Sequence, residues 1–134
     1  MEDIFAARIM STDLHTVSPD TLVEEAAQVL LDNDIGAVPV VDGENRLVGI
    51  LTTTDFVTIV ANSEPKAETT VARYMTTDVV TADPQETIVT VATTMLEGGF
   101  HHVPVVDEVK GLIGIVSTTD LAAYLSDAQS ASIR

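Results

Sequence analysis

The chain contains one sequence pattern twice, and the two copies run in the same register. The first copy centres on residues 38–55 and the second on residues 103–120. In each, a Val-Pro-Val-Val-Asp segment precedes a turn and then an aliphatic run that ends in Thr/Ser-Thr-Thr-Asp. Pro39 and Pro104 are 65 positions apart, and every other matched pair has the same spacing. Such a repeat indicates one supersecondary unit that is used twice.

The size of the repeat predicts that the two copies share a core. The chain has 134 residues, and a unit of about 65 residues buries little surface and would be only marginally stable alone. The expected organisation is residues 1–63 for the first copy, 64–70 for a polar connector, 71–127 for the second copy and 128–134 for a frayed tail.

A helix is expected early in each copy, because apolar residues recur there at helical spacing. Thr21 followed by Glu24 predicts a capping box at the start of the first helix. Asp32-Asn33-Asp34 predicts its end, and Gly98-Gly99 predicts the end of the second. The expected apolar stripes are Val23, Ala26, Ala27, Leu30 and Leu31 in the first copy, and Ile88, Val91, Ala92, Met95 and Leu96 in the second.

A hairpin follows the first helix, with strands predicted at Ala37–Val41 and Leu47–Leu51 and turn residues between them. Pro39 favours a strand start or an edge position, because proline cannot donate a ladder hydrogen bond. A brief strand is expected near His15–Val17, and a second helix from Thr52–Asp55 to about Ala61. The repeat is therefore β-α-β-β-α, and the fold class is α/β in the broad sense (α+β).

Composition excludes several classes of partner. The net charge is −15, from 21 acidic and six basic residues, which opposes binding to nucleic acid or to anionic membranes. An acidic coat of this kind suits concentrated salt, so a high-salt cytosol is one hypothesis for the source. The absence of cysteine excludes disulfides and thiolate sites. The N-terminus lacks the pattern of a signal peptide and no apolar run is long enough to span a bilayer, so a cytoplasmic location is expected.

These motifs together resemble the cystathionine-β-synthase (CBS) domain family, here as a tandem pair or Bateman module, over about residues 7–125. The resemblance rests on Met-Ser/Thr-x-Asp at the start of each copy, Pro-Val-Val-Asp in the hairpin, and Gly-Ile-x-Thr/Ser-x-x-Asp entering the last helix. Gly99 to Pro104 is similar to the usual lead-in of the family. The resemblance implies a pseudo-twofold pair with two clefts for adenosyl compounds, and a disc-like homodimer of two pairs.

The resemblance also implies roles for individual residues. Asp55 and Asp120 are expected to accept hydrogen bonds from a ribose diol, since a carboxylate is an acceptor-only, bidentate group. The hydroxyls of Thr52 and Ser117, with Thr53 and Thr118 beside them, are expected near phosphate at a helix N-terminus. The implied adenine slot comprises Thr16, Val38, Pro39, Thr81, Val103 and Pro104.

Structural interpretations of the same residues remain open. Ser/Thr-x-x-Asp is also the pattern of a plain helix capping box, and the valines and prolines also suit a core. His101 and His102 are adjacent on a strand and point to opposite faces, so no metal site is expected, and His102 either lines a cleft or packs. For Arg8 and Arg73, salt bridges to the abundant carboxylates are favoured over phosphate contacts.

The predicted function is a regulatory module that binds an adenosyl compound and signals to an unidentified effector protein. No cofactor is required, and the candidate ligands are AMP, ADP, ATP, adenosine and S-adenosylmethionine. The scarcity of cations disfavours ATP. The alternative is a structural or protein-interaction module with non-binding clefts. An enzyme is not expected, because no nucleophile is paired with a base and an orienting group.

Overall fold

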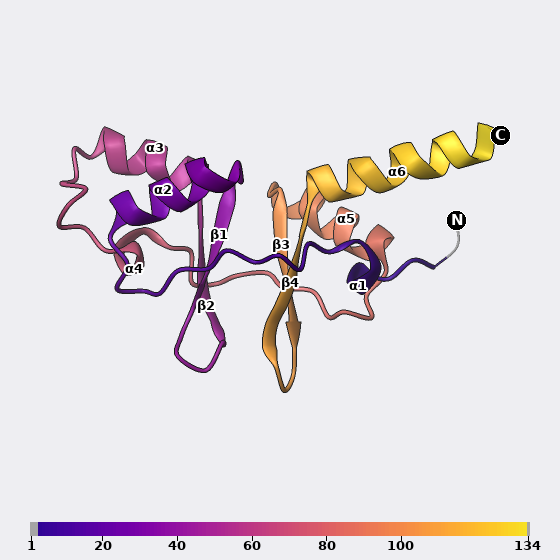
Figure 1. The fold of residues 1–134 in the computed structure, drawn as a ribbon, viewed down its shortest axis with the longest axis horizontal. Helices are drawn as coiled ribbons and strands as arrows, with labels where there is room; N and C mark the ends of the chain where they lie inside the picture. The colour runs from indigo at the N-terminus through magenta and orange to yellow at the C-terminus, as the bar shows by residue number, and fades with distance from the viewer. Residues whose placement is uncertain (1–2, 134) are drawn as a thin grey trace. The chain divides into compact units, whose positions relative to one another are not determined.

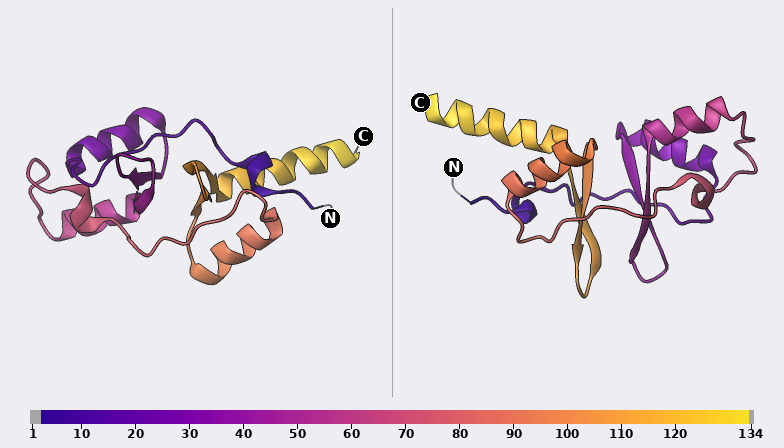
Figure 2. Two further views of the ribbon diagram at one scale, coloured as in Figure 1. Left: turned by 90° about the horizontal axis from the view of Figure 1, so that it is seen from below. Right: turned by 180° about the vertical axis from the view of Figure 1, so that it is seen from behind.

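The computed structural model describes residues 3–133, which form two compact units. Residues 15–79 make one unit, and the residues before 15 join those from 80 onward in the other. The chain therefore passes from one unit to the other after Leu14 and again after Val79 (Figures 1 and 2). The fold is of the α+β class, with two small antiparallel sheets.

The unit of residues 15–79 is built on the β1–β2 hairpin, with α2 and α3 lying on one side of it (Figure 1). Val17 pairs in parallel with Val40 at the outer edge of β1, and Thr76 pairs with Ile50 at the outer edge of β2. The elements are α2 (Val23–Asn33), β1 (Ala37–Val41), β2 (Leu47–Thr52), α3 (Thr53–Ala61) and α4 (Val71–Tyr74).

The second unit repeats this plan around the β3–β4 hairpin, with α5 and α6 on one side (Figure 2). Ala82 pairs in parallel with Val105, and Ser11 pairs with Ile115. The elements are α1 (Ala6–Ile9), α5 (Ile88–Gly98), β3 (His102–Asp107), β4 (Gly111–Ser117) and α6 (Thr118–Ile133). The helical backbone of α6 thus continues past Asp127 to Ile133.

The leading segment of each copy lies in the unit that holds the hairpin of the other copy. In one unit the Ala6 N–H donates to the carbonyl of Glu86 at 2.7 Å. In the other, the Val71 N–H donates to the carbonyl of Thr21 at 2.8 Å. These four residues occupy matched positions of the repeat, and Ala6 and Val71 are both fully buried. The two copies therefore exchange their leading segments.

Pro39 lies in the middle of β1, and the bonds around it show why it is tolerated. Ile50 lies opposite Pro39 in the ladder. The N–H of Ile50 donates to the Thr76 carbonyl at 3.0 Å, and its carbonyl accepts from the Thr76 N–H at 2.9 Å. The Pro39 carbonyl accepts from the Val17 N–H at 3.1 Å on the other side. Position 39 therefore needs no N–H toward β2. The strand expected near His15–Val17 is reduced to this single bridge at Val17.

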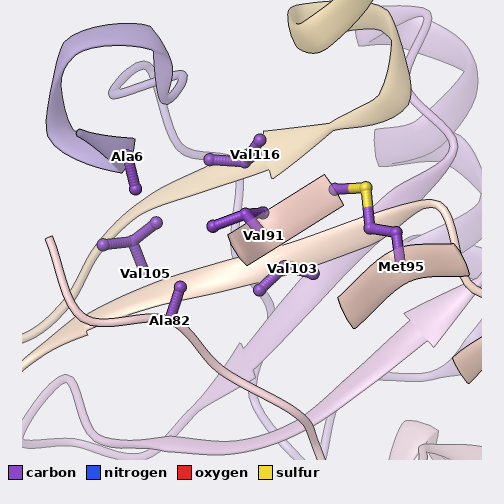
Figure 3. Packing of buried hydrophobic residues seen from close by; sticks show 7 residues of the cluster. All are labelled: Ala6, Ala82, Val91, Met95, Val103, Val105 and Val116. Carbon is purple, nitrogen blue, oxygen red and sulfur yellow. The ribbon is translucent and has the colours of Figure 1, made fainter. Parts of the chain in front are cut away.

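Each unit has an aliphatic core between its hairpin and its helices. Figure 3 shows how valines of the β3–β4 hairpin meet α5, α1 and Ala82 in one of them. The predicted stripes are confirmed for most of their length but are wrong at the last position. Leu31 is 75% exposed and Leu96 is 84% exposed. The buried members of the cluster in Figure 3 are Ala6, Ala82, Val91, Met95, Val103, Val105 and Val116.

The capping box predicted at Thr21 and Glu24 is wrong. Helix α2 begins at Val23, its N-cap is Leu22, and no side chain caps it. The Thr21 hydroxyl instead accepts from the Ser18 N–H at 3.1 Å, within the preceding turn. The predicted helix ends are confirmed: Asp34 and Gly99 both adopt the left-handed conformation that follows a helix, with φ of 51° and 70°. In residues 3–133 no helix is long and apolar enough to cross a membrane.

A glycine in each hairpin permits the exchanged segment to pack closely. A Cβ placed on buried Gly49 would lie 2.7 Å from Met75 Sδ and 3.0 Å from the Thr76 carbonyl oxygen. A Cβ on Gly114 would overlap the side chain of Met10 in the same way. Met10 and Met75 are matched positions, so both units use one arrangement: a methionine side chain against a residue without a Cβ.

This packing predicts the effect of a single methyl group. Gly49→Ala is expected to destabilise the fold by about 1–3 kcal/mol, because the added Cβ overpacks against Met75 and the backbone at Thr76. Urea unfolding followed by circular dichroism measures the change. Gly43→Ala is the control, since no atom lies within 4 Å of its Cβ position; it is expected to shift stability by less than about 0.5 kcal/mol. Equal stability of the two variants would contradict the prediction.

Candidate functional site

The junction between β2 and α3 holds Asp55 by hydrogen bonds from Thr52. The Thr52 N–H donates to Asp55 Oδ2 at 2.7 Å, and the Thr52 hydroxyl donates to the same oxygen at 3.3 Å. The next N–H, of Thr53, donates to the Gly36 carbonyl at 3.1 Å. Among the residues whose side chains the structure describes, none donates a hydrogen bond to Asp55 Oδ1. Oδ2 of Asp55 therefore takes part in the helix cap, and Oδ1 is free to accept hydrogen bonds.

The junction between β4 and α6 repeats this arrangement at Asp120. Its Oδ2 accepts from the Ser117 N–H at 2.8 Å and from the Ser117 hydroxyl at 3.0 Å. The Asp120 N–H donates back to Ser117 Oγ at 3.1 Å, which completes a capping box. The Thr118 N–H donates to the His101 carbonyl at 3.0 Å.

Ser11 adds a contact here that sequence reasoning missed. Its hydroxyl donates to Asp120 Oδ1 at 3.3 Å, across 109 positions of the chain. Ser11 is held next to β4 by its backbone pairing with Ile115. The motif Met-Ser/Thr-x-Asp marks Ser11 and Thr76 as matched positions, but only knowledge of the segment exchange places Ser11 beside Asp120.

The structure shows that the capping interpretation is correct for both junctions, and that each cap uses one oxygen of the carboxylate. Each cap uses Oδ2 only, so the Oδ1 atoms are the groups that could meet a ribose. A phosphate would find fewer free donors here than the sequence led us to expect. The first helical N–H is bonded in both helices, and the hydroxyls of Thr52 and Ser117 donate to the carboxylates. The hydroxyl-bearing residues Thr53 and Thr118 are exposed.

The six residues of the implied adenine slot fall into two groups. Val38 and Val103 are buried in the cores, and Pro39 and Pro104 are buried beside them. Thr16 and Thr81 are exposed and directly precede the bridging residues Val17 and Ala82. Only the threonines therefore offer side chains to solvent.

His102 lies opposite Ser117 in the β3–β4 ladder and is half-buried. Burial lowers the pKa of His102 because it disfavours the charged form, and the charge of neighbouring His101 lowers it further. The carboxylate of Asp120 acts in the opposite direction. Ala37 occupies the matched position in the other unit, so the two junctions differ in polarity.

Two open clefts lie in the unit of residues 15–79. One, of about 680 Å³, runs between the Thr16–Thr21 turn, α2 and the tip of the β1–β2 hairpin, and Asp20, Glu25 and Asp42 line it. Of the expected ligand residues it contains Thr16 alone. The other, of about 600 Å³, is a groove between α2 and α3 with apolar walls that include Leu31, Phe56 and Val60.

Both arginines of the unit of residues 15–79 form ion pairs with carboxylates. Arg73 lies 3.1 Å from Glu64, as the sequence favoured, and Arg46 lies 2.9 Å from Asp42 and 3.3 Å from Glu44. Arg8 forms no such pair with any residue between 3 and 133. Within the same range no three His, Asp or Glu side chains are grouped closely enough to hold a metal ion.

Comparison with known families matches both copies. The CBS domain family accounts for residues 6–62 and again for residues 71–127. The chain therefore belongs to the CBS domain family and carries two CBS domains in tandem, as its motifs predicted.

Relatives differ in length. The chain is 34% identical over 121 residues to an uncharacterized 17.7 kDa protein of Acidianus ambivalens, a match that covers 90% of this chain and 73% of that protein. It is also 34% identical over 121 residues to a homoserine O-acetyltransferase of Methanosalsum zhilinae, but there it spans only 24% of the relative. The remaining three quarters of that enzyme has no counterpart in this chain.

Among solved structures, the CBS domain pair of protein MJ0100 is similar over nearly the whole chain. Its TM-score is 0.85 at 29% identity, and the match covers 95% of this chain and 99% of that one. That pair was crystallised in complex with 5′-methylthioadenosine and S-adenosyl-L-methionine. The likeness confirms the predicted fold of a tandem CBS pair.

The lowered pKa of His102 predicts a pH dependence. Its folded-state pKa is below the usual 6.5, so around and just below pH 6.5 the unfolded state binds more protons than the folded state. Stability is therefore lost as pH falls through this window, and His102 contributes no such loss above it. Melting temperatures between pH 5 and 8 should fall less steeply on acidification for His102→Ala, the residue of the matched position, than for the wild type. Identical slopes would contradict the assignment.

Proposed function

We propose that this chain is a regulatory module that binds an adenosyl compound and passes its occupancy to a partner protein. The observation that carries the proposal is the repeated junction at Asp55 and Asp120, where one carboxylate oxygen caps a helix and the second makes no bond to the backbone. A carboxylate in this state suits a ribose diol, because it accepts but never donates. The adenosyl ligands of the similar MJ0100 pair support the same class.

Adenine is proposed to lie near Thr16 or Thr81, against the hairpin segments that contain Val38-Pro39 and Val103-Pro104. Backbone groups and apolar walls would hold the base, as in most small-molecule sites. Thr52, Ser117, Thr53 and Thr118 are the polar residues beside the proposed ribose site. His102 lies at the same end of the β3–β4 ladder as Ser117.

The charge of the chain limits the number of phosphates on the ligand. A net charge of −15 repels a triphosphate, and both helix starts use their first N–H internally. Adenosine, AMP and the positively charged sulfonium of S-adenosylmethionine are therefore favoured over ADP and ATP. Salt would screen part of this penalty. No catalytic step is assigned to the chain.

The test is a thermal-shift titration in molar KCl with AMP, ADP, ATP, adenosine, 5′-methylthioadenosine and S-adenosylmethionine. A ligand that binds only the folded state raises the melting temperature with its saturation. The shift is expected to disappear in Asp55→Ala with Asp120→Ala, because lost hydrogen bonds to a charged group weaken binding by about tenfold or more.

A charge-matched control separates recognition from general electrostatics. Glu24→Ala with Glu97→Ala removes two exposed carboxylates from α2 and α5 and is expected to keep the shift. Wild-type protein that folds but responds to none of these compounds would refute ligand binding and favour the interaction-module alternative.

The same module is proposed to form a homodimer through its helices. Large apolar side chains are exposed at matched positions of both helix pairs: Leu31 and Leu96 at 75% and 84%, and Val60 and Leu125 at 77% and 52%. Leu31 and Val60 line one groove between α2 and α3. Exposed apolar groups that lie together are typical of interaction surfaces, and a twofold dimer uses the same surface on both chains. The module is proposed to act in the cytoplasm.

Leu96→Glu is expected to shift the protein from dimer to monomer, because it places a charge in the proposed contact. Size-exclusion chromatography with light scattering measures the mass. Val109→Glu is the control, since Val109 is 92% exposed in the β3–β4 turn, away from the helices. A monomeric wild type, or a Leu96→Glu variant that remains dimeric, would refute this surface.

A further inference from the structure

The two junction carboxylates differ in the hydrogen bonds that their oxygens already accept. At Asp55, Oδ2 accepts from the N–H and the hydroxyl of Thr52, and Oδ1 accepts nothing from any described residue. At Asp120, Oδ2 accepts two bonds from Ser117, and Oδ1 accepts the hydroxyl of Ser11. The caps are therefore equivalent, and the difference between the sites lies in Oδ1.

The backbones that carry Ser11 and its matched residue are held alike. Ser11 exchanges hydrogen bonds of 2.8 and 3.1 Å with Ile115, and Thr76 exchanges bonds of 3.0 and 2.9 Å with Ile50. The hydroxyl of Thr76 nevertheless forms no hydrogen bond with Asp55. The asymmetry is thus a property of one side chain, and a single substitution can remove it.

The acceptor positions that remain on each Oδ1 limit the number of ribose hydroxyls that it can bind. A carboxylate oxygen has about two acceptor positions, and both are taken on each Oδ2. Asp55 Oδ1 keeps two, enough for both hydroxyls of a ribose. Asp120 Oδ1 keeps one while Ser11 is bound, so a ribose there either gains a single hydrogen bond or must displace Ser11.

We propose that Ser11 is a positioning residue that makes the Asp120 site weaker and less selective for ribose than the Asp55 site. The inference rests on the proposed function and adds to it an order of filling: the Asp55 site fills at the lower ligand concentration. Occupancy of the Asp120 site by a full ribose is coupled to release of the Ser11 hydroxyl from the carboxylate.

If Ser11 instead oriented Asp120 for the ligand, removing its hydroxyl would weaken binding at this site. The geometry disfavours that role. Three hydrogen bonds with Ser117, of 2.8, 3.0 and 3.1 Å, already fix Asp120. The bond from Ser11, at 3.3 Å, is the longest of the four, and its donor is an exposed side chain. Its removal therefore costs little orientation and frees one acceptor position.

The experiment isolates each site and measures its selectivity by calorimetry with adenosine and 2′-deoxyadenosine. Asp55→Ala leaves the Asp120 site, and Asp120→Ala leaves the Asp55 site. The Asp55 site is expected to prefer adenosine by ~10-fold, because one hydrogen bond to a charged group is lost with the 2′-hydroxyl. The Asp120 site is expected to show a preference below ~3-fold, because one hydroxyl already saturates its Oδ1.

Adding Ser11→Ala to Asp55→Ala should raise the adenosine preference of the Asp120 site to ~10-fold and tighten adenosine binding several-fold. Adding Thr76→Ala to Asp120→Ala is the matched control and should change neither quantity. The melting temperature of the Ser11→Ala variant without ligand should equal that of the wild type, which separates positioning from a general structural effect.

The two sites together distinguish failure of the inference from failure of the proposed function. Unchanged or weaker binding on adding Ser11→Ala, with the Asp55 site still active, overturns the role of Ser11 and leaves the proposed function standing. The role of Ser11 is equally overturned if the Asp120 site binds neither nucleoside with or without Ser11. Failure of the wild type to bind either nucleoside or any other adenosyl compound removes the proposed function, and the inference with it.

Discussion

The exchange of leading segments is the interaction on which both units depend. Ala6 and Val71 are fully buried, and each bonds to the loop before a helix that belongs to the other copy. The same segments then supply Ser11 and Thr76 to the outer edges of β4 and β2. Without them each hairpin would expose an unpaired edge, and each core would lose one wall. The glycines at 49 and 114 fit this arrangement, because any side chain there would push the segment away.

The sequence predicted the local elements well, and physical reasons explain the rest. Hairpins and helices follow from period, turn residues and the repeat, and they lie where these signals place them. The exchange leaves no such signal: the two copies have the same pattern in the same register, so pairing within a copy and pairing between copies look alike. Thr21 and Glu24 show a second limit, since a capping pattern competes with the preceding turn, which takes the same hydroxyl.

The candidate site was predictable in its residues but not in its bonds. Asp55 and Asp120 stand out because the pattern occurs twice, and the role in ribose binding that the family resemblance implies for them stays a prediction. Spacing cannot decide whether such a residue caps a helix or meets a ligand. The structure shows that the cap occupies Oδ2 of each carboxylate and that Oδ1 is not part of the cap. The Ser11 contact depends on tertiary structure alone, because it joins residues 109 positions apart.

The reciprocal bonds at Ala6 and Val71 also bear on how such a chain arises. A protein with one copy of the repeat could form these bonds only by trading its first segment with a second molecule, so its folding would depend on concentration. Joining two copies end to end makes the trade intramolecular and removes that dependence. In the tandem chain both leading segments are present at a fixed effective concentration, and the sequence of each copy becomes free to diverge. Such divergence is visible at two pairs of matched positions: Ser11 and Thr76, and Ala37 and His102.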